Sequence, residues 1–255
     1  MKKKRKTVQD YIRTLFKVIN SSDLLLEVLD ARMPKDTRIP KLERMITNKK
    51  KELILVINKA DLVPEDFVEK VKSQFEYEYP TVYISTKTRK GSRALRKAIK
   101  DYAPFKDKVY IGVFGYPNTG KSSLINILVG RHRVGVSPTP GFTKGMQLIK
   151  LSRKFYLIDT PGVYFPQSEV DLAIKGGVDP SKVRYPMKAV RYLYDRLPRE
   201  VFEETYKISF NDFEDFLEKL AKKRGFLLSG KPDKERAARQ VLRDWINGKI
   251  KGYWL

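Results

Sequence analysis

The stretch from Gly115 to Ser122, Gly-Tyr-Pro-Asn-Thr-Gly-Lys-Ser, constrains the fold of this chain more than any other. An apolar run rich in β-branched residues precedes it at 109–114, and an apolar run suited to a helix follows at 123–128. A glycine loop between a strand and a helix is the context that a Walker A phosphate-binding loop requires. The glycines let backbone N–H groups converge on phosphate oxygens, together with the positive end of the helix dipole. The stretch therefore predicts a phosphate-binding loop.

Each polar side chain of this loop has an expected role. Lys121 is expected to reach the β- and γ-phosphates of a nucleotide, and the Ser122 hydroxyl to bind Mg²⁺. An ordinary glycine turn is the alternative, which the flanking strand and helix patterns disfavour. The expected nucleotide contacts of the loop are Gly115, Asn118, Thr119, Gly120, Lys121, Ser122 and Ser123.

Strand and helix patterns alternate along the first two thirds of the chain. Strand patterns lie at 24–29, 53–57, 82–84, 109–114, 146–151 and 155–158. Helical spacing of apolar residues occurs at 40–51, 64–75 and 92–102. This alternation predicts an α/β fold of the P-loop NTPase type, with three layers and a mostly parallel six-stranded sheet. Ligand loops are expected at the carboxyl ends of the strands.

After about Gly177 the pattern becomes entirely helical, with helices expected at 186–197, 198–206, 212–224 and 233–247. We therefore expect four parts along the chain. They are a basic N-terminal helix at 1–22, a nucleotide-binding domain at 23–165, a linker at 166–177 and a small all-α domain at 178–255.

The formal net charge of +23 indicates a polyanionic partner. Both parts of the chain are basic, and RNA fits better than an anionic membrane because no basic stretch is also strongly amphipathic. A lysine-rich thermophile surface is the alternative, but it should carry matching Glu. The sequence contains no cysteine and no apolar run of about 20 residues, so we expect a cytoplasmic protein without a membrane partner.

Two short motifs after predicted strands indicate recognition of a guanine base. In Asn58-Lys59-Ala60-Asp61, the carboxylate of Asp61 can accept the N1–H and 2-amino donors of guanine, a pair that adenine lacks. Lys59 is expected to lie along the base, and Asn58 to tie the loops together. Ser85, Thr86 and Lys87 are expected to flank the base and its O6. Without the phosphate loop elsewhere in the chain, each motif would be interpreted as an ordinary loop.

A third set of residues is expected around the metal and the γ-phosphate. Asp159 ends a predicted strand and is expected to hold Mg²⁺ through water, while the N–H of Gly162 reaches the γ-phosphate. An Asx turn is the alternative for Asp159. In the long loop 131–145, Thr143 is chosen as the second hydroxyl on Mg²⁺, and Thr139 remains open as an alternative.

Taken together, these motifs resemble the five signature motifs of TRAFAC-class GTPases, in an unusual order. The base-reading motifs precede the phosphate loop, as in the circularly permuted GTPases of the YlqF/RbgA (MMR1/HSR1) type, which act in ribosome assembly. Asp30-Ala31-Arg32-Met33-Pro34 and the C-terminal stretch from Arg236 are also similar to that family. The resemblance implies GTP hydrolysis to GDP and phosphate, and a role in assembly of the large ribosomal subunit. A monomer is expected.

The catalytic residues are less clearly indicated. Val163 stands where many GTPases have a glutamine that orients water, so slow unaided hydrolysis is expected. Lys121 and Thr143 are the expected catalytic groups, with Asn118, which resembles the asparagine that holds K⁺ in related GTPases; a turn asparagine is the alternative. His132 is expected to be exposed rather than catalytic. A nucleotide-sensing rRNA-binding scaffold with negligible hydrolysis remains the alternative function, and an ATP-using enzyme a third.

The last predicted helix carries a row of basic residues. Arg236, Arg239 and Arg243 share one face, while Ala238, Leu242 and Trp245 share another. The apolar face is expected to pack in the core, and the arginine row to contact rRNA phosphates, with a solvated charged face as the alternative.

Overall fold

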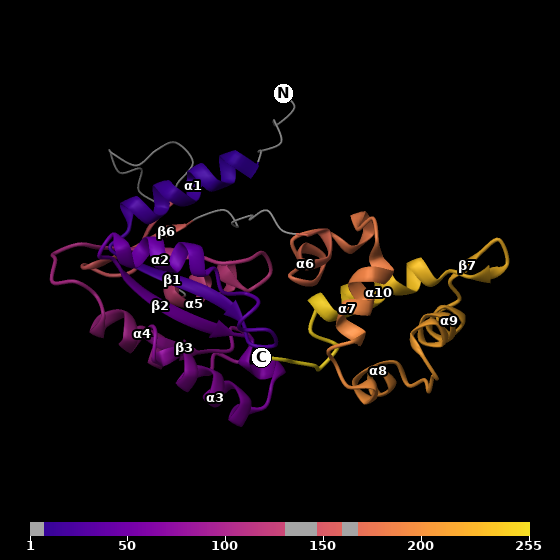
Figure 1. Ribbon diagram of the computed structural model, residues 1–255. Coiled ribbons are helices and arrows are strands. Elements are labelled where there is room, and N and C mark those ends of the chain that lie inside the picture. The colour runs from indigo at the N-terminus through magenta and orange to yellow at the C-terminus, as the bar shows by residue number, and fades with distance from the viewer. Residues whose placement is uncertain (1–7, 131–146, 160–167) are drawn as a thin grey trace. The chain divides into compact units, whose positions relative to one another are not determined.

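The protein is described by a computed structural model for residues 8–130, 147–159 and 168–255 (Figure 1). The chain forms two compact units, residues 1–165 together with Leu255, and residues 166–254. We call them the nucleotide-binding unit and the helical unit.

The nucleotide-binding unit contains a six-stranded sheet with the strand order β3-β2-β1-β4-β6-β5. Neighbouring strands run parallel except β5, which pairs antiparallel with β6. The expectation of a mostly parallel six-stranded sheet is confirmed. The strands are β1 (Leu24–Asp30), β2 (Glu52–Asn58), β3 (Thr81–Tyr83), β4 (Val109–Phe114), β5 (Gln147–Lys150) and β6 (Phe155–Asp159).

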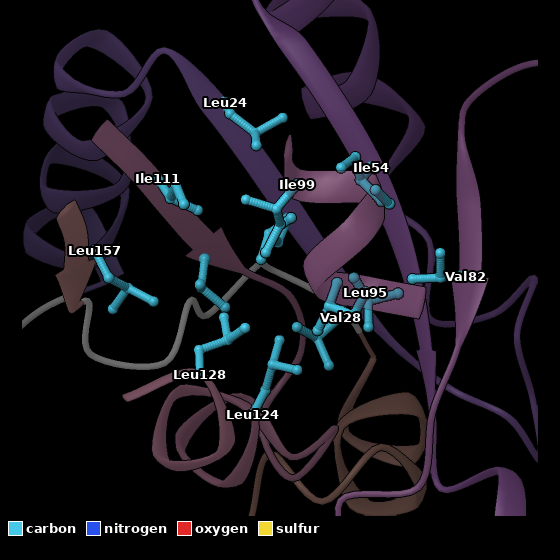
Figure 2. Packing of buried hydrophobic residues seen from close by; sticks show 14 of the residues in the cluster. Leu24, Val28, Ile54, Val82, Leu95, Ile99, Ile111, Leu124, Leu128 and Leu157 are labelled. Atoms are coloured by element: carbon cyan, nitrogen blue, oxygen red, sulfur yellow. The ribbon is translucent and has the colours of Figure 1, made fainter. Parts of the chain in front are cut away.

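Helices cover both faces of this sheet. On one face, residues of α1 (Val8–Ser21), α2 (Pro40–Asn48) and α3 (Glu65–Glu76) share a core with β1 and β2. On the other face, α4 (Ser92–Asp101) and α5 (Lys121–Val129) pack on the sheet. Figure 2 shows this second core, in which Leu95 and Ile99 of α4 and Leu124 and Leu128 of α5 meet strand residues such as Ile111. The central strands are buried on both faces, which explains their continuous apolar runs.

One charged residue interrupts the apolar run of β1. The carboxylate of Glu27 is fully buried and accepts a hydrogen bond from the Ile39 N–H at 2.7 Å, at the start of α2. Burial and the neighbouring Glu43 raise the pKa of Glu27 well above its usual range. The carboxylate of Glu43 pairs with the guanidinium of Arg38 at 2.6 Å. The loop before α2 is therefore held to β1 by Glu27 and to α2 by Glu43.

The topology brings the predicted motifs to one edge of the sheet. β1 pairs in parallel with both β2 and β4, and β2 pairs in parallel with β3. The carboxyl ends of β2, β3 and β4 therefore lie at the same edge of the sheet. The segments that follow are Asn58–Asp61, Ser85–Lys87 and Gly115–Ser122. A short 3₁₀ helix, η1 (Ala60–Leu62), contains Asp61.

The helical unit contains α6 (Glu169–Ile174), η2 (Pro180–Lys182), α7 (Pro186–Tyr194), α8 (Arg199–Tyr206), α9 (Phe213–Lys223) and α10 (Lys234–Ile246). A small hairpin of β7 (Leu227–Leu228) and β8 (Lys231–Pro232) joins the last two helices.

Two expectations for this region differ from the structure. The segment 166–177, expected to be a linker, contains α6, because Leu172, Ala173 and Ile174 are buried against the rest of the unit. The indole N–H of Trp245 also donates to the Ile174 carbonyl at 3.1 Å. The unit is not entirely helical either, since the turn at 229–230 pairs the short β7 and β8. Both elements are too short to give a periodic pattern in the sequence.

No helix in the described part of the chain is long and apolar enough to cross a bilayer.

Candidate functional site

The phosphate loop connects β4 to α5, as the sequence predicts, and its glycines lie where other residues would not fit. Gly115 has φ +139° and packs on β1, where a Cβ would be 2.5 Å from the Val28 carbonyl oxygen. Gly120 has φ +96°, and a Cβ there would be 2.1 Å from the Asn58 amide nitrogen. Close backbone approach therefore requires glycine at both positions.

The ammonium of Lys121 is buried at the first residue of α5. Its side chain is 8% exposed, and Nζ donates to the Tyr116 carbonyl oxygen of the loop. No carboxylate pairs with it within the described residues. Burial, with the charge of nearby Lys59, lowers the pKa of Lys121 to about 8. A buried cation at a helix N-terminus is a site that favours an anion such as phosphate.

Asn58 joins the two parts of the site. Its side chain is fully buried, and Nδ2 donates to the Thr119 carbonyl at 2.7 Å in the phosphate loop. Its Oδ1 accepts the backbone N–H of Thr86 at 3.1 Å. One amide thus holds together three loops that lie up to 61 residues apart in the sequence. These two bonds fit the expectation that Asn58 ties the loops together.

Asp61 and Ser85, two of the residues expected to contact the base, are in direct contact. The Ser85 hydroxyl donates to the Asp61 carboxylate at 2.6 Å and accepts from the Thr88 N–H at 3.1 Å. Ser85 is buried, whereas Asp61 is exposed and so accessible to a ligand. Thr86 is half-buried and Lys87 is exposed at the same loop.

A buried ion cluster behind the base-reading loop is the part of the site that the sequence reasoning missed. Asp30 accepts from Lys59 at 2.7 Å and from Arg32 at 2.8 and 3.0 Å. Burial opposes the ionisation of Asp30, but the charges of Arg32 and Lys59 outweigh it and hold its pKa well below its usual range. Lys59 itself has φ +64°. The signal in the sequence was an Asp and an Arg two residues apart at the end of a strand that is apolar except for Glu27.

The remaining residues of the predicted site are described only in part. Ser122 and Ser123 are exposed in the first turn of α5, and Asn118 is exposed with φ +57°. Thr143, Gly162, Thr139, His132 and Val163 lie outside the described residues. For Asp159 the backbone is described, as the last residue of β6 opposite Gln147.

The arginine row of α10 belongs to the helical unit. Arg236 and Arg243 are exposed, and Arg236 lies over the Phe226 ring at 4.5 Å. Arg239 is half-buried and pairs with Glu235 at 3.1 Å. On the other face, Ala238, Leu242 and Trp245 are fully buried, as expected for a core face.

Comparison with known proteins gives a consistent result. Residues 110–228 match the family described as "50S ribosome-binding GTPase". The chain is 40% identical over 248 residues to nucleolar GTP-binding protein 2 of Schizosaccharomyces pombe, covering 92% of this chain and 46% of that protein. It is 37% identical over 244 residues to an uncharacterized GTP-binding protein of Methanocaldococcus jannaschii, covering 93% of this chain and 65% of that protein. The chain thus spans about half the length of its nucleolar relative.

The fold is similar to that of solved structures. GNP-bound YlqF from T. maritima superposes with a TM-score of 0.70 at 25% sequence identity, covering 93% of this chain and 94% of the other. A GDP-bound structure of the same protein gives a TM-score of 0.68.

The names of the relatives correct one expectation. Proteins similar to this chain are called nucleolar in yeasts and nuclear or nucleolar in plants, which points to the nucleolus rather than to the cytoplasm at large. The expected cytoplasmic location is therefore wrong. Its main argument was the lack of cysteine, which cannot separate cytosol from nucleus because both compartments keep thiols reduced.

The order of the motifs, the sheet topology and these comparisons agree: the chain has the fold of a P-loop GTPase similar to YlqF, and its residues 110–228 match the model of the 50S ribosome-binding GTPases.

Proposed function

We propose that this protein binds GTP and hydrolyses it to GDP and phosphate as a step in ribosome assembly. The observation that supports this most is the Asn58 amide, which bonds to both the guanine loop and the phosphate loop. A single guanine nucleotide can then contact both loops at once.

In this proposal the phosphate loop binds the triphosphate. Backbone N–H groups between Gly115 and Ser123 donate to phosphate oxygens. Those of Asn118, Thr119 and Gly120 are among them. The Lys121 ammonium leaves the Tyr116 carbonyl and bonds to the β- and γ-phosphates, which also restores its ordinary pKa. The charge that builds up on these oxygens during hydrolysis is thereby stabilised. The Gly162 N–H is assigned to the γ-phosphate.

In this proposal, guanine is recognised by the loops at residues 58–61 and 85–87. The carboxylate of Asp61, oriented by Ser85, accepts the two donors on one edge of the base. Lys59, oriented by Asp30, lies along the ring, and the N–H of Thr86, the Ser85 loop and Lys87 flank it. An adenine base offers no donor pair to Asp61, so ATP is rejected.

Mg²⁺ is assigned to hydroxyl and carboxylate oxygens, which are its preferred protein ligands. Ser122 in the first turn of α5 fits this role, because its exposed hydroxyl adjoins the phosphate loop. Thr143 and Asp159 are proposed as the other two. When bound, the ion neutralises charge on the β- and γ-phosphates.

Asn118 is proposed to hold a K⁺ ion, which supplies positive charge where other GTPases use an arginine. Its left-handed backbone fits a residue that projects from the loop, although a turn asparagine has the same geometry. Hydrolysis should then be faster in KCl than in NaCl at equal ionic strength. Equal rates in both salts contradict this assignment.

The ribosomal role is supported by the description of the matched family and by the charge of +23. We propose a precursor of the large subunit as the partner, a monomeric protein, and rRNA phosphate contacts from Arg236, Arg239 and Arg243. Of these, Arg239 is the weakest candidate, because it already pairs with Glu235.

Multiple-turnover hydrolysis tests the proposal. GTP hydrolysis should be slow for the protein alone and increase about ten-fold or more with large ribosomal subunits or their precursors, while ATP is not turned over. A negligible rate that subunits do not change would instead make the protein a nucleotide-sensing scaffold on rRNA.

A further inference from the structure

A second basic surface lies on the nucleotide-binding unit, over α4 and the loop before it. Between residues 86 and 101 there are seven basic residues and one acidic residue, Asp101. Within α4, four of the basic residues recur at positions i, i+3, i+4 and i+7: Arg93, Arg96, Lys97 and Lys100. This spacing places them along one side of the helix. The other side, with Leu95, Ala98 and Ile99, is buried in the core of Figure 2.

The neighbouring helix α3 has the opposite composition. Residues 65–78 contain five acidic and two basic residues. Both helices contact β3, from opposite faces of the same sheet. The basic charge is therefore concentrated at α4, and is not a uniform property of the surface of this chain.

The stability of α4 accounts for only part of the basic row, because Lys100 lies in the last turn, where the helix dipole favours a cation. Like charges three and four residues apart destabilise a helix. The first turn of α4 contains Arg93 and no acidic residue, although the helix dipole favours acidic side chains there. Arg93, in the first turn, is therefore better explained by an anionic partner than by the stability of the helix.

Part of the basic surface is already used by the fold. Arg96 donates to the carbonyls of Ile127 and Leu128 at the end of α5, at 2.6 and 3.1 Å. Lys97 pairs with Asp101, and Lys90 with Glu65. Four others are exposed and have no carboxylate within ion-pair distance in the described ranges: Lys87, Arg89, Arg93 and Lys100.

Aromatic and apolar groups adjoin these charges. Tyr102 is 44% exposed and Phe105 is completely exposed, in the segment that directly follows α4. A hollow of about 220 Å³ lies between α4, α5 and the β5–β6 turn, with Arg96 and Lys100 among its lining and Leu128 and Phe155 among its apolar walls. Exposed rings and apolar hollows beside cations accept unstacked bases.

We propose that α4 and the preceding loop 86–91 form an RNA-binding surface, which contacts phosphates through Arg93 and Lys100 and unpaired bases through Phe105. RNA is favoured over an anionic membrane because the exposed side of α4 presents no large apolar residue that could enter a bilayer. The inference deepens the proposed role in ribosome assembly by naming a contact surface on the GTPase unit itself, apart from the arginines of α10.

The test compares two double variants that remove the same charge. R93Q/K100Q changes the proposed surface, and K70Q/K72Q changes the acidic helix α3. Binding of the full chain to a labelled RNA hairpin with a single-stranded flank is measured over a range of KCl concentrations, without nucleotide. R93Q/K100Q should weaken binding about ten-fold and flatten the slope of log K against log salt by about 2, since one contact contributes about 1. K70Q/K72Q should leave the slope unchanged.

Phe105→Ala gives an independent measurement. It should weaken binding to the single-stranded flank about ten-fold while leaving binding to a blunt duplex unchanged. If both double variants lose affinity equally, only net charge matters and the proposal is overturned. Flotation with phosphatidylserine vesicles should leave the protein unbound; binding that R93Q/K100Q abolishes would assign the surface to membranes instead. Circular dichroism checks that each variant is folded.

GTP affinity, measured separately, distinguishes this inference from the proposed function. If the protein binds no GTP but the α4 variant still loses RNA affinity, the surface stands and the GTPase proposal fails. If GTP is bound and hydrolysed normally while R93Q/K100Q binds RNA like the unchanged chain, the surface is wrong and the GTPase proposal stands.

Discussion

On the side of the site proposed to bind guanine, Asp61 and Lys59 contact other side chains of the protein, whereas on the proposed phosphate side the ammonium of Lys121 contacts only a backbone carbonyl oxygen. Asp61 accepts from Ser85, and Lys59 is paired with Asp30. Lys121 is more deeply buried and bonds only to a carbonyl oxygen of its own loop. Burial lowers the pKa of both lysines, to about 8 for Lys121, but only Lys59 has a carboxylate beside it. The guanine side is therefore assembled before the ligand arrives, while the phosphate side is held under electrostatic strain that an anion relieves.

The largest expected effect comes from removing that strained charge. Lys121→Met should lower GTP hydrolysis by about a thousand-fold, because the developing charge on the phosphates loses its nearest cation. Without nucleotide, the same variant should unfold at the same temperature as the unchanged chain or higher, since no cation is buried. Thermal unfolding and single-turnover hydrolysis measure the two effects. A variant that is clearly less stable would show that Lys121 is satisfied in the free protein, and the contrast between the two sides would fail.

The pH dependence of stability tests the same charge without ligand. Because the folded pKa of Lys121, about 8, lies below its unfolded value, the ammonium destabilises the fold at neutral pH. That cost is relieved as pH rises from the folded value toward the unfolded value of 10.5. The gain should be up to about 3 kcal/mol in the free energy of unfolding. Urea titrations across this range should show it, and Lys121→Met should remove it.

On the guanine side, Asp61→Asn should change specificity more than stability. The amide cannot accept both guanine donors, so GTP affinity should fall about a hundred-fold, and xanthosine triphosphate should bind better than GTP. Because Asp61 is exposed and the amide oxygen can still accept from Ser85, the weaker bond should reduce stability by no more than about 1 kcal/mol. Nucleotide competition assays measure the preference. Retained GTP affinity would remove the base-reading role.

The smallest expected change is at the residue that joins the two sides. Asn58→Ala leaves the Thr119 carbonyl and the Thr86 N–H without their buried partner, at a cost of about 2 kcal/mol in stability. Asn48→Ala makes the same chemical change at the exposed end of α2 and should cost less than about 0.5 kcal/mol. GDP binding to Asn58→Ala should weaken, because the loops are no longer held in register. If both variants behave alike, the two sides of the site are independent.

Much of the fold followed from local patterns in the sequence. Gly115, Gly120 and Lys121 between a β-branched run and an apolar helix predicted the phosphate loop, because that backbone path needs residues without a Cβ. Continuous apolar runs predicted strands buried on both faces, and their alternation with helices predicted the parallel sheet. These features depend on neighbours in the chain, which a single sequence displays.

Other features depended on contacts between distant segments. The ion cluster of Asp30, Arg32 and Lys59 exists only because β1 and β2 pair in register, with Asp30 opposite Asn58. Helix α6 is fixed by burial in the helical unit and by the bond from Trp245, 71 residues away. Neither the ion cluster nor helix α6 produces a periodic pattern of apolar residues in the sequence.

The sequence by itself indicated which residue types are proposed to face a nucleotide, because glycine, lysine and carboxylate at fixed spacings have few other uses. Only the tertiary structure decided which of those charges are compensated. Burial and pairing depend on how separate strands and helices pack. This is why Lys59 has a carboxylate within 2.7 Å, while Lys121 has none in the described residues and is proposed to bind the phosphates of a ligand.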